Sequence, residues 1–507
     1  MGTQLRASAH PQSYSFHMRT NTSRTWTWNH QQGVAIYLKA KIDYCSCSAP
    51  VRHWRSYVTK ANHSTEQLKD DFISTPTKKK KGTVVGAVAL IVGTSIGSGI
   101  LALPKKTSPA GFIPSATSMV LCWGFLLIEA LLLTEINVNI RRRMKKREDE
   151  DKLEIISIRT MAQETLGTWG GNFATINYIF LAYTSMVAYT SKAGEILSRV
   201  INLPASLSGI LFTIIFTTLI SFGGPRFTDQ INQWLTASMI GLLVAIEVIG
   251  ASSGAWSELM SISNWDKVPG TVPVIIFSLV FHDLAPVLCT YLGGDLARIR
   301  VSVVVGSLLP LIALIVWDAV ALSLSPLADG IDPINMLMRV NWSGVATMVQ
   351  VFSLLAVGTS QIGTLLGFSQ FFLEQLNFLT SRSTSKQMKE VERKQRALFG
   401  LKDWWGDNKT SFTAMAMAVA PPLLVSTSVP DAFSTATDIA GGYCMAMLYG
   451  VLPPAMAWAM HGKSYDDGGG GGEITLYKVK PALIGVGLLS CGILLEQLLQ
   501  DLSFLHL

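Results

Sequence analysis

The stretch Val92-Gly93-Thr94-Ser95-Ile96-Gly97-Ser98-Gly99-Ile100 lies in the middle of an apolar run, residues 82–103, that is long enough to cross a lipid bilayer. Three glycines and three hydroxyl residues within seven positions disfavour a continuous helix. In hydrocarbon, freed backbone groups need partners, so an unwound segment at this depth is tolerated where it lines a cavity. A broken first helix is typical of transporter binding sites, although small residues also serve close packing between helices.

The composition is that of a membrane protein. Of the 507 residues, 49% are hydrophobic and only 15% are charged, whereas soluble domains carry about 25% charged residues. The six cysteines have no zinc-binding spacing, and Gly468 to Gly472 lacks the Lys and Ser/Thr that end a phosphate-binding loop. We therefore expect no disulfide framework, no metal site and no cofactor.

The first 60 residues have the composition of an organelle-targeting segment. They contain eight Lys or Arg, thirteen Ser or Thr, and a single acidic residue, Asp43. A basic, hydroxyl-rich leader that is poor in acidic residues predicts a plastid or mitochondrial transit peptide; a disordered cytosolic tail is the alternative. We expect residues 1–77 to form this leader and to take no part in the fold.

Apolar runs of bilayer-spanning length follow one another from Lys78 onward. We predict eleven helices, at residues 82–103, 112–139, 170–192, 203–222, 229–250, 271–294, 301–323, 345–378, 412–429, 432–459 and 480–500. With the amino terminus inside, the inner segments after residue 77 contain 26 Lys and Arg and the outer segments contain six. This asymmetry satisfies the positive-inside rule, and it explains the net charge of +7 without nucleic acid as a partner.

A second break is predicted in the sixth helix, where the chain reads Phe281-His282-Asp283-Leu284-Ala285-Pro286. Proline removes a backbone donor and clashes with the carbonyl four residues earlier, which here belongs to His282. Ionisable residues halfway across a membrane are costly and usually mark a pathway, so His282 beside Asp283 indicates function more strongly than a lone buried histidine would.

The two breaks begin two sets of five helices with opposite orientation. Helices 1–5 start inside, and helices 6–10 start outside. This pattern predicts an all-α polytopic membrane protein with a 5+5 inverted repeat, helices 1 and 6 broken, and an eleventh helix added. We assign repeat one to residues 82–250, repeat two to 271–459, a Gly-rich loop to 461–479, and the last helix and C-terminus to 480–507.

Other polar or aromatic residues within predicted spans are weaker candidates. Tyr183 lies nearest the middle of helix 3 and is the candidate for stacking on a substrate ring, although aromatic residues in a span more often serve packing or the membrane interface. The remaining candidates are Glu129, Tyr178, Tyr189, Thr359, Ser360 and Gln361.

These residues resemble a known family. The stretch from Gly93 to Pro104 resembles the opening signature of the tryptophan/tyrosine permeases, the hydroxy and aromatic amino acid permeases. Three further stretches are similar to the family pattern: Phe281-His282 with Pro286; Gly293 to Arg300 with Gly306, Pro310 and Trp317; and Pro421-Pro422, Pro430, Phe433, Ala440-Gly441 and Leu452-Pro453. The resemblance covers about residues 82–460.

The resemblance implies a LeuT-like fold of the amino acid–polyamine–organocation superfamily and proton-coupled transport of an aromatic amino acid. Bacterial members carry an acidic residue near the end of helix 8, where this chain reads Gly367-Phe368-Ser369-Gln370-Phe371. Asp283 stands where small residues are common in those relatives and could take over part of that role. Together with the leader, the resemblance suggests a plant plastid member in the chloroplast inner envelope, with the mitochondrial inner membrane as the alternative.

The predicted mechanism follows from the two breaks. Backbone N–H groups near the first break would receive the substrate carboxylate, and carbonyls at both breaks would accept from its ammonium group. His282, with Asp283, would take up the coupled proton, because imidazole titrates near neutrality. The predicted substrate-binding residues are Gly93, Thr94, Ser95, Ile96, Gly97, Ser98, Gly99, Phe281 and Tyr183.

Three alternatives stay open at this point. A sodium-coupled carrier or uniporter of another neutral amino acid would use the same fold. A sensor or scaffold could keep the fold without transport. A membrane enzyme could use His282, Asp283 and Glu129 as acid and base, although the sequence contains no nucleophile–base motif.

Overall fold

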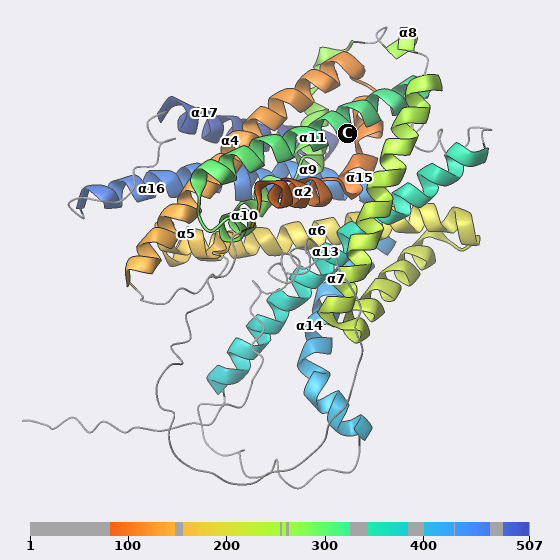
Figure 1. Cartoon of the computed structure of the whole chain (residues 1–507). Coiled ribbons are helices and arrows are strands. Elements are labelled where there is room, and N and C mark those ends of the chain that lie inside the picture. Colours follow the sequence, from red (N-terminus) through yellow and green to blue (C-terminus); the bar gives the residue numbers. More distant parts are fainter. Residues whose placement is uncertain are drawn as a thin grey trace, which may run out of the picture.

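The computed structural model describes residues 82–147, 156–253, 256–259, 263–324, 343–383, 400–429, 431–466 and 480–505. This part of the chain is a bundle of helices (Figure 1), nine of which are long and apolar enough to cross a membrane. Two other predicted spans are the broken first helix and α6, Thr168–Ile201. The predicted leader, 1–77, and most of the predicted Gly-rich loop at 461–479 lie outside the described residues.

The first helix is broken where the glycines predict it. It consists of α2 (Val84–Ser95), the 3₁₀ turn η1 (Ser98–Leu101) and α3 (Leu103–Thr107). The extended backbone of Ile96, with φ −85° and ψ 111°, ends α2, and Gly97 after it is fully extended, with φ −157° and ψ −156°. Pro104 lies in the first turn of α3, where its missing N–H is not needed.

The sixth helix is broken as well. It is divided into α9 (Val272–Ser278), the 3₁₀ turn η4 (His282–Leu284) and α10 (Ala285–Tyr291). Pro286 lies in the first turn of α10, so the residue predicted to open the helix also starts its second half. The prediction that helices 1 and 6 are both broken is confirmed.

The other predicted spans are found, with adjusted bounds. Predicted helices 4 and 5 are the two arms of α7, which changes direction at Gly224, where φ is +70° (Figure 1). The remaining elements are α4 (Phe112–Arg147), α5 (Ile158–Leu166), α7 (Ala205–Ser253), α8 (Trp256–Leu259), η2 (Trp265–Lys267), η3 (Pro269–Thr271), α11 (Leu296–Leu324), α13 (Ser343–Ser383), α14 (Gly400–Ser428), α15 (Ala432–Ile439), η6 (Ala440–Val451), α16 (Leu452–Asp466) and α17 (Lys480–Leu505).

The predicted tenth helix is continuous but not uniform. Between α15 and α16, the segment η6 is a π-helix. Such segments are rare and occur frequently at functional sites. Gly441 at its start allows close packing on α9, because a Cβ there would lie 1.9 Å from the carbonyl oxygen of Pro273. Nothing in the apolar sequence of this span predicted the π geometry.

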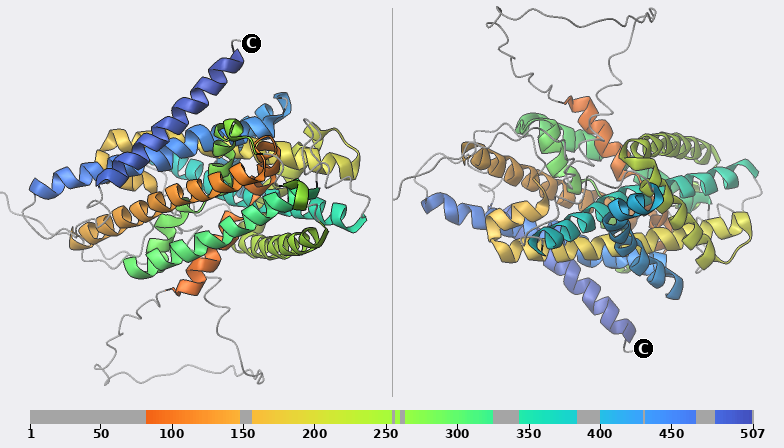
Figure 2. Two further views of the ribbon diagram at one scale, coloured as in Figure 1. Left: turned by 90° about the horizontal axis from the view of Figure 1, so that it is seen from above. Right: turned by 90° about the horizontal axis from the view of Figure 1, so that it is seen from below.

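The two broken helices meet in the centre of the bundle. Turn η1 packs against α9 and α13, and α9 in turn packs against η6. One hydrophobic core joins these elements to α4, α6 and α11. Figure 2 shows α2 and α17 projecting from the bundle, at an angle to the long helices.

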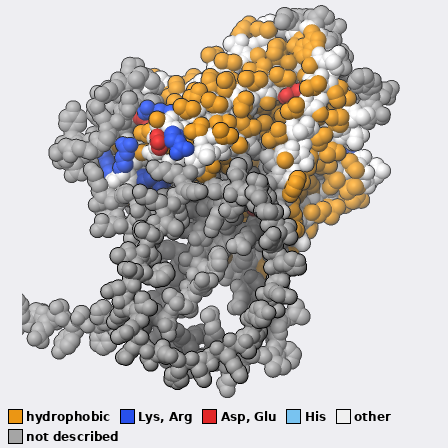
Figure 3. All heavy atoms as spheres, viewed as in Figure 1, with side chains coloured by type: hydrophobic (Ala, Val, Ile, Leu, Met, Phe, Trp, Pro, Cys, Tyr) orange, Lys and Arg blue, Asp and Glu red, His pale blue; other side chains and the backbone are white. Residues whose placement is uncertain are grey.

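The outer surface of the bundle is apolar. Exposed side chains on different helices include Leu121, Val248 and Leu424, at 69%, 65% and 70% exposure. Figure 3 shows this hydrophobic surface, with Lys and Arg side chains gathered at one end of the visible face. We call that end, where α4 ends and α11 begins, the inner side, and the end where α3 and α15 meet the outer side.

Candidate functional site

A cavity of about 730 Å³ lies at the two breaks. Every residue from Gly93 to Gly99 lines it, as do His282 and Asp283 of the second break. Ligand cavities usually have volumes of about 300–1,000 Å³, so this one is large enough for an amino acid with an aromatic side chain. The structure therefore brings together nine of the eleven predicted site residues.

The two breaks touch each other directly. The Ser278 hydroxyl, at the end of α9, donates to the carbonyl oxygen of Gly99 at 2.8 Å and is also 2.7 Å from the carbonyl oxygen of Val274. A Cβ on Gly99 would lie 2.8 Å from the Ser278 Cα, closer than side chains normally approach a backbone. Glycine is required at position 99 because the backbones of the two breaks are in contact.

Helices α13 and α6 complete the wall around the first break. The Ser98 amide donates to the Ser360 hydroxyl at 3.0 Å, so α13 occupies one of the N–H groups predicted to receive a carboxylate. Tyr189 of α6 is buried, and its hydroxyl interacts with Ser98, Ser185 and Thr364. Ser98, Ser360 and Tyr189 all line the cavity.

His282 lies at the edge of the cavity with its ring enclosed. The side chain is fully buried, and the ring of Tyr449 from η6 packs edge-on against it, with centroids 4.3 Å apart. Among the described residues, neither ring nitrogen of His282 has a hydrogen-bond partner. A buried neutral imidazole without partners leaves one N–H donor and one acceptor nitrogen unsatisfied, and a water molecule or a ligand group could satisfy them.

Asp283 differs from its two neighbours. His282 and Leu284 are buried, whereas Asp283 is exposed, and it lines the cavity. Its carboxylate interacts electrostatically with Tyr189 and Tyr449, which also line the cavity. The second break therefore presents a carboxylate to the space in which a substrate would bind.

Two predicted site residues do not reach the cavity. Phe281 is only 2% exposed and does not line it; its ring packs 6.0 Å from that of His282. Tyr183 faces away: its hydroxyl donates to the Met417 carbonyl oxygen at 3.0 Å, and its ring packs edge-on against Phe368 at 4.7 Å. The structure places Tyr183 in a separate aromatic cluster between α6, α13 and α14.

The weaker candidates also divide between cavity and packing. Tyr178, Tyr189, Thr359 and Ser360 line the cavity. Gln361 is fully buried, with its amide 3.4 Å from the hydroxyl of Thr213, and it does not line the cavity. Glu129 is also fully buried, beside Gly450 and away from the cavity. Tyr449 lines the cavity but was not predicted, because a tyrosine in an apolar span is indistinguishable from a packing residue.

The cavity extends toward the inner side. Its wall includes Ser157 to Met161 of α5, Asp229 and Asn232 after the Gly224 bend, and Gln370 near the end of α13. Neither α3 nor α15, the elements that meet at the outer side, contributes to the wall. In the part of the chain that the structure describes, the cavity is therefore open toward the inner side and closed toward the outer side.

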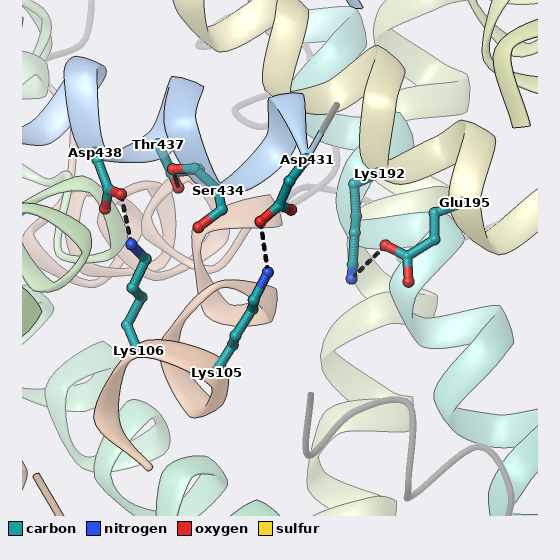
Figure 4. A network of polar contacts seen from close by, with 8 residues as sticks. All are labelled: Lys105, Lys106, Lys192, Glu195, Asp431, Ser434, Thr437 and Asp438. Atoms are coloured by element: carbon teal, nitrogen blue, oxygen red, sulfur yellow. Dashed lines mark hydrogen bonds and ion pairs between the residues drawn. The ribbon is translucent and has the colours of Figure 1, made fainter. Parts of the chain in front are cut away.

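Ion pairs join α3 to α15 on the outer side. Lys105 lies 2.8 Å from Asp431, and Lys106 lies 2.5 Å from Asp438 (Figure 4). The first pair is largely exposed, at 39% and 61%, whereas the second is more enclosed, at 26% and 21%. Both lysines belong to the half of helix 1 that follows the break.

A third lysine extends this polar network toward α6. Lys192 is 1% exposed and lies 2.9 Å from Glu195 (Figure 4). Its ammonium group also lies 5.1 Å above the ring of Phe433, next to the ion-paired start of α15. A cation over an aromatic face is stabilised by the ring quadrupole, which helps to hold α15 against α6.

Buried hydrogen bonds join α3 and η1 to α11. The indole N–H of Trp317 donates to the Ile100 carbonyl oxygen at 3.0 Å, and the Thr107 hydroxyl donates to Asp318 at 2.7 Å. All three side chains are fully buried. The outer half of helix 1 is thus held by buried hydrogen bonds inside the bundle and by ion pairs at its surface.

The broken helices, their shared cavity and the pattern of spans define a LeuT-like membrane transporter fold. A solved structure with this fold, that of MhsT in complex with L-phenylalanine, aligns with a TM-score of 0.53 at 14% identity, covering 83% of this chain and 99% of that one. The predicted fold class is confirmed.

The family follows from sequence comparison. The chain belongs to the tryptophan/tyrosine permease family, whose model matches residues 80–467. It is 25% identical over 403 residues to tyrosine-specific transport system 2 of Haemophilus influenzae, and the aligned region covers 75% of this chain and 88% of that protein. It is 24% identical over 406 residues to a tryptophan-specific transport protein of Pseudomonas aeruginosa, with 75% and 87% covered. The resemblance noted in the sequence is confirmed.

Proposed function

We propose that this protein is a secondary transporter that carries aromatic amino acids, tryptophan or tyrosine, across a membrane by alternating access. The observation that supports it most strongly is the shared cavity, because two helix breaks of opposite repeats open onto one space of suitable volume. The similarity to tyrosine- and tryptophan-specific transport proteins supports the same substrate class.

In this proposal the substrate carboxylate binds the amide groups at Ser98 and Gly99, after the Ser360 hydroxyl turns away from the Ser98 amide. The aromatic side chain lies among Tyr178, Tyr189 and Tyr449. This replaces Tyr183 and Phe281 as the expected stacking partners, because neither of them lines the cavity.

We further propose that transport is coupled to protons. In this proposal His282, beside Asp283, takes up and releases the coupled proton. The support for this role is the buried imidazole without partners at the cavity edge. Exchange of labelled for unlabelled substrate needs no gradient, whereas accumulation does. His282→Gln is therefore expected to retain exchange and lose accumulation driven by a proton gradient. Accumulation equal to wild type would exclude this role.

The first test is uptake of labelled tryptophan and tyrosine into proteoliposomes, with a proton gradient imposed and then collapsed by an uncoupler. The expected result is gradient-dependent accumulation of at least one of them. Accumulation driven only by a sodium gradient would replace the proton as coupling ion. No uptake of either by folded protein would contradict the proposed substrate class.

The location is a separate proposal. The basic, hydroxyl-rich composition of residues 1–60 supports a transit peptide of plastid type and residence in the chloroplast inner envelope. Fusion of residues 1–77 to a fluorescent protein is expected to direct it into plastids. Delivery to mitochondria would favour the alternative membrane.

A further inference from the structure

Asp283 is a carboxylate at the depth of the substrate. It lies near the middle of the span Pro269–Tyr291, directly after the unwound residues that follow α9. It is exposed although both of its sequence neighbours are buried, and the space to which it is exposed is the cavity that it lines. Ionisable side chains within a membrane span usually face a water-filled cavity or pair with an opposite charge, and they mark substrate or ion pathways.

The other charged groups of the cavity lie elsewhere. Among the described residues that line it, the remaining Asp, Glu, Lys and Arg side chains are Arg159 and Asp229. Arg159 is on α5 and Asp229 follows the Gly224 bend, so both belong to the inner mouth. Asp229 also accepts a hydrogen bond from Gln233 at 3.1 Å. At the level of the breaks, no Lys or Arg side chain of the described cavity wall accompanies Asp283.

Tyr189 connects Asp283 to the first break. Its hydroxyl interacts with Ser98, and it is close enough to Asp283 for an electrostatic interaction with the carboxylate. The ammonium and carboxylate groups of an α-amino acid are attached to the same carbon atom, so their binding groups must also lie close together. The amides of the first break and the carboxylate of the second break line the same cavity, and Tyr189 interacts with residues of both breaks.

We infer that Asp283 binds the ammonium group of the substrate, while the first break binds its carboxylate. The inference rests on the proposed function and narrows it to substrates that carry a free, cationic amino group. It leaves the coupled proton to His282, because a carboxylate that is paired with the substrate's ammonium is already neutralised.

The test compares two ligands that differ in one group. Tryptophan has an ammonium group, and indole-3-propionate has the same ring and carboxylate without it. Equilibrium binding of both labelled ligands is measured on purified, full-length protein. Asp283→Asn is expected to weaken tryptophan binding about 10- to 100-fold, the range for a hydrogen bond between charged groups, and to leave indole-3-propionate binding unchanged.

Asp229→Asn is the matched control, because it removes another carboxylate from the same cavity. It is expected to leave the ratio of the two affinities unchanged. An Asp283→Asn variant that loses affinity for both ligands equally, or for neither, would overturn the inference. A second result would also overturn the inference. If withdrawal of sodium lowers the affinity of the wild-type protein for tryptophan but not that of the Asp283→Asn variant, Asp283 binds sodium.

The outcomes also separate the inference from the proposed function. Wild-type protein that accumulates tryptophan while Asp283→Asn keeps the wild-type affinity ratio contradicts the inference and preserves the function. Wild-type protein that binds and transports no aromatic amino acid contradicts both.

Discussion

The two halves of the first helix are held in different ways. The outer half, η1 and α3, is bound to α11 by two buried hydrogen bonds, one donated by Trp317 and one accepted by Asp318. Two ion pairs join it to α15. The inner half, α2, packs against α11, and Gly82 just before it is fixed by two hydrogen bonds: Gly82 donates to the Tyr291 carbonyl oxygen at 2.8 Å, and Arg298 donates to the Gly82 carbonyl oxygen at 2.6 Å.

This difference explains which side of the cavity is open. On the outer side, the contacts of η1 and α3 with α11 and α15 hold these elements together over the breaks. The inner half packs against α11 and leaves the bundle at an angle (Figure 2), and only its last turns, from Leu90 to Ser95, line the cavity. We conclude that closure of the outer side depends on the contacts of η1 and α3. Substitutions at the contacts of the two halves should therefore differ in their effect, from Gly99 with the largest to Arg298 with the smallest.

Gly99→Ala is expected to have the largest effect. The added methyl group would lie 2.8 Å from the Ser278 Cα, and overpacking against backbone costs about 1–3 kcal/mol because neither break can move freely. Uptake should fall roughly tenfold or more. Gly241→Ala is the control, since no atom lies within 4 Å of its added Cβ. Equal activity of the two variants would contradict the close contact between the breaks.

Trp317→Phe is expected to open the outer side while keeping a smaller aromatic side chain at this position. It leaves the buried Ile100 carbonyl without its donor, at a cost of about 1–3 kcal/mol. Ser434, buried beside the ion pairs in Figure 4, can be replaced by cysteine as a reporter of opening. Its reaction with an impermeant thiol reagent should accelerate about tenfold in the Trp317→Phe variant. The parent protein without Ser434→Cys gives the background rate.

The two ion pairs are expected to matter less and unequally. Partly exposed pairs contribute about 0.2–1 kcal/mol because water and salt screen them. Lys106→Gln should increase the reactivity of Ser434→Cys a few-fold, since it also leaves the more enclosed Asp438 unpaired. Lys105→Gln should change it less, because Asp431 is 61% exposed. The reverse order would show that burial does not decide the strength of this closure.

Arg298→Gln should have the smallest effect on the outer side. It removes the hydrogen bond to Gly82, which lies at the start of the inner half. Because the cavity is already open on that side, the reactivity of Ser434→Cys should stay within about twofold of the unsubstituted protein. A large increase would show that the two halves move as one rigid unit, and the contrast between them would then be wrong.

The breaks could be predicted from the sequence because their causes are local. Gly97, Gly99 and Pro286 disfavour helix through their own backbone chemistry, whatever surrounds them. The inverted repeat followed from the order and orientation of apolar runs. All seven residues from Gly93 to Gly99, which the sequence predicted to bind substrate, line the cavity.

The remaining wall of the site could not be predicted, because it depends on which face each helix presents. Tyr183 was chosen over Tyr189 for its depth in the span, yet their six-residue separation places them on different faces of α6. Tyr183 joins the aromatic cluster, and Tyr189 reaches Ser98. Likewise, Phe281 and Asp283 are two residues apart, but the irregular turn directs only Asp283 to the cavity.

The depth of the cavity also determines where the membrane voltage acts. An opening that reaches the breaks from the inner side brings the inner solution halfway across the bilayer. The potential then falls mainly across the closed outer half, where Trp317 and Lys106 are packed. Moving one elementary charge across a potential of 100 mV changes its energy by about 2.3 kcal/mol. In this structure, most of that energy change would occur as the charge passes η1 and α3. The contacts that close the outer side therefore form the insulating layer of the protein.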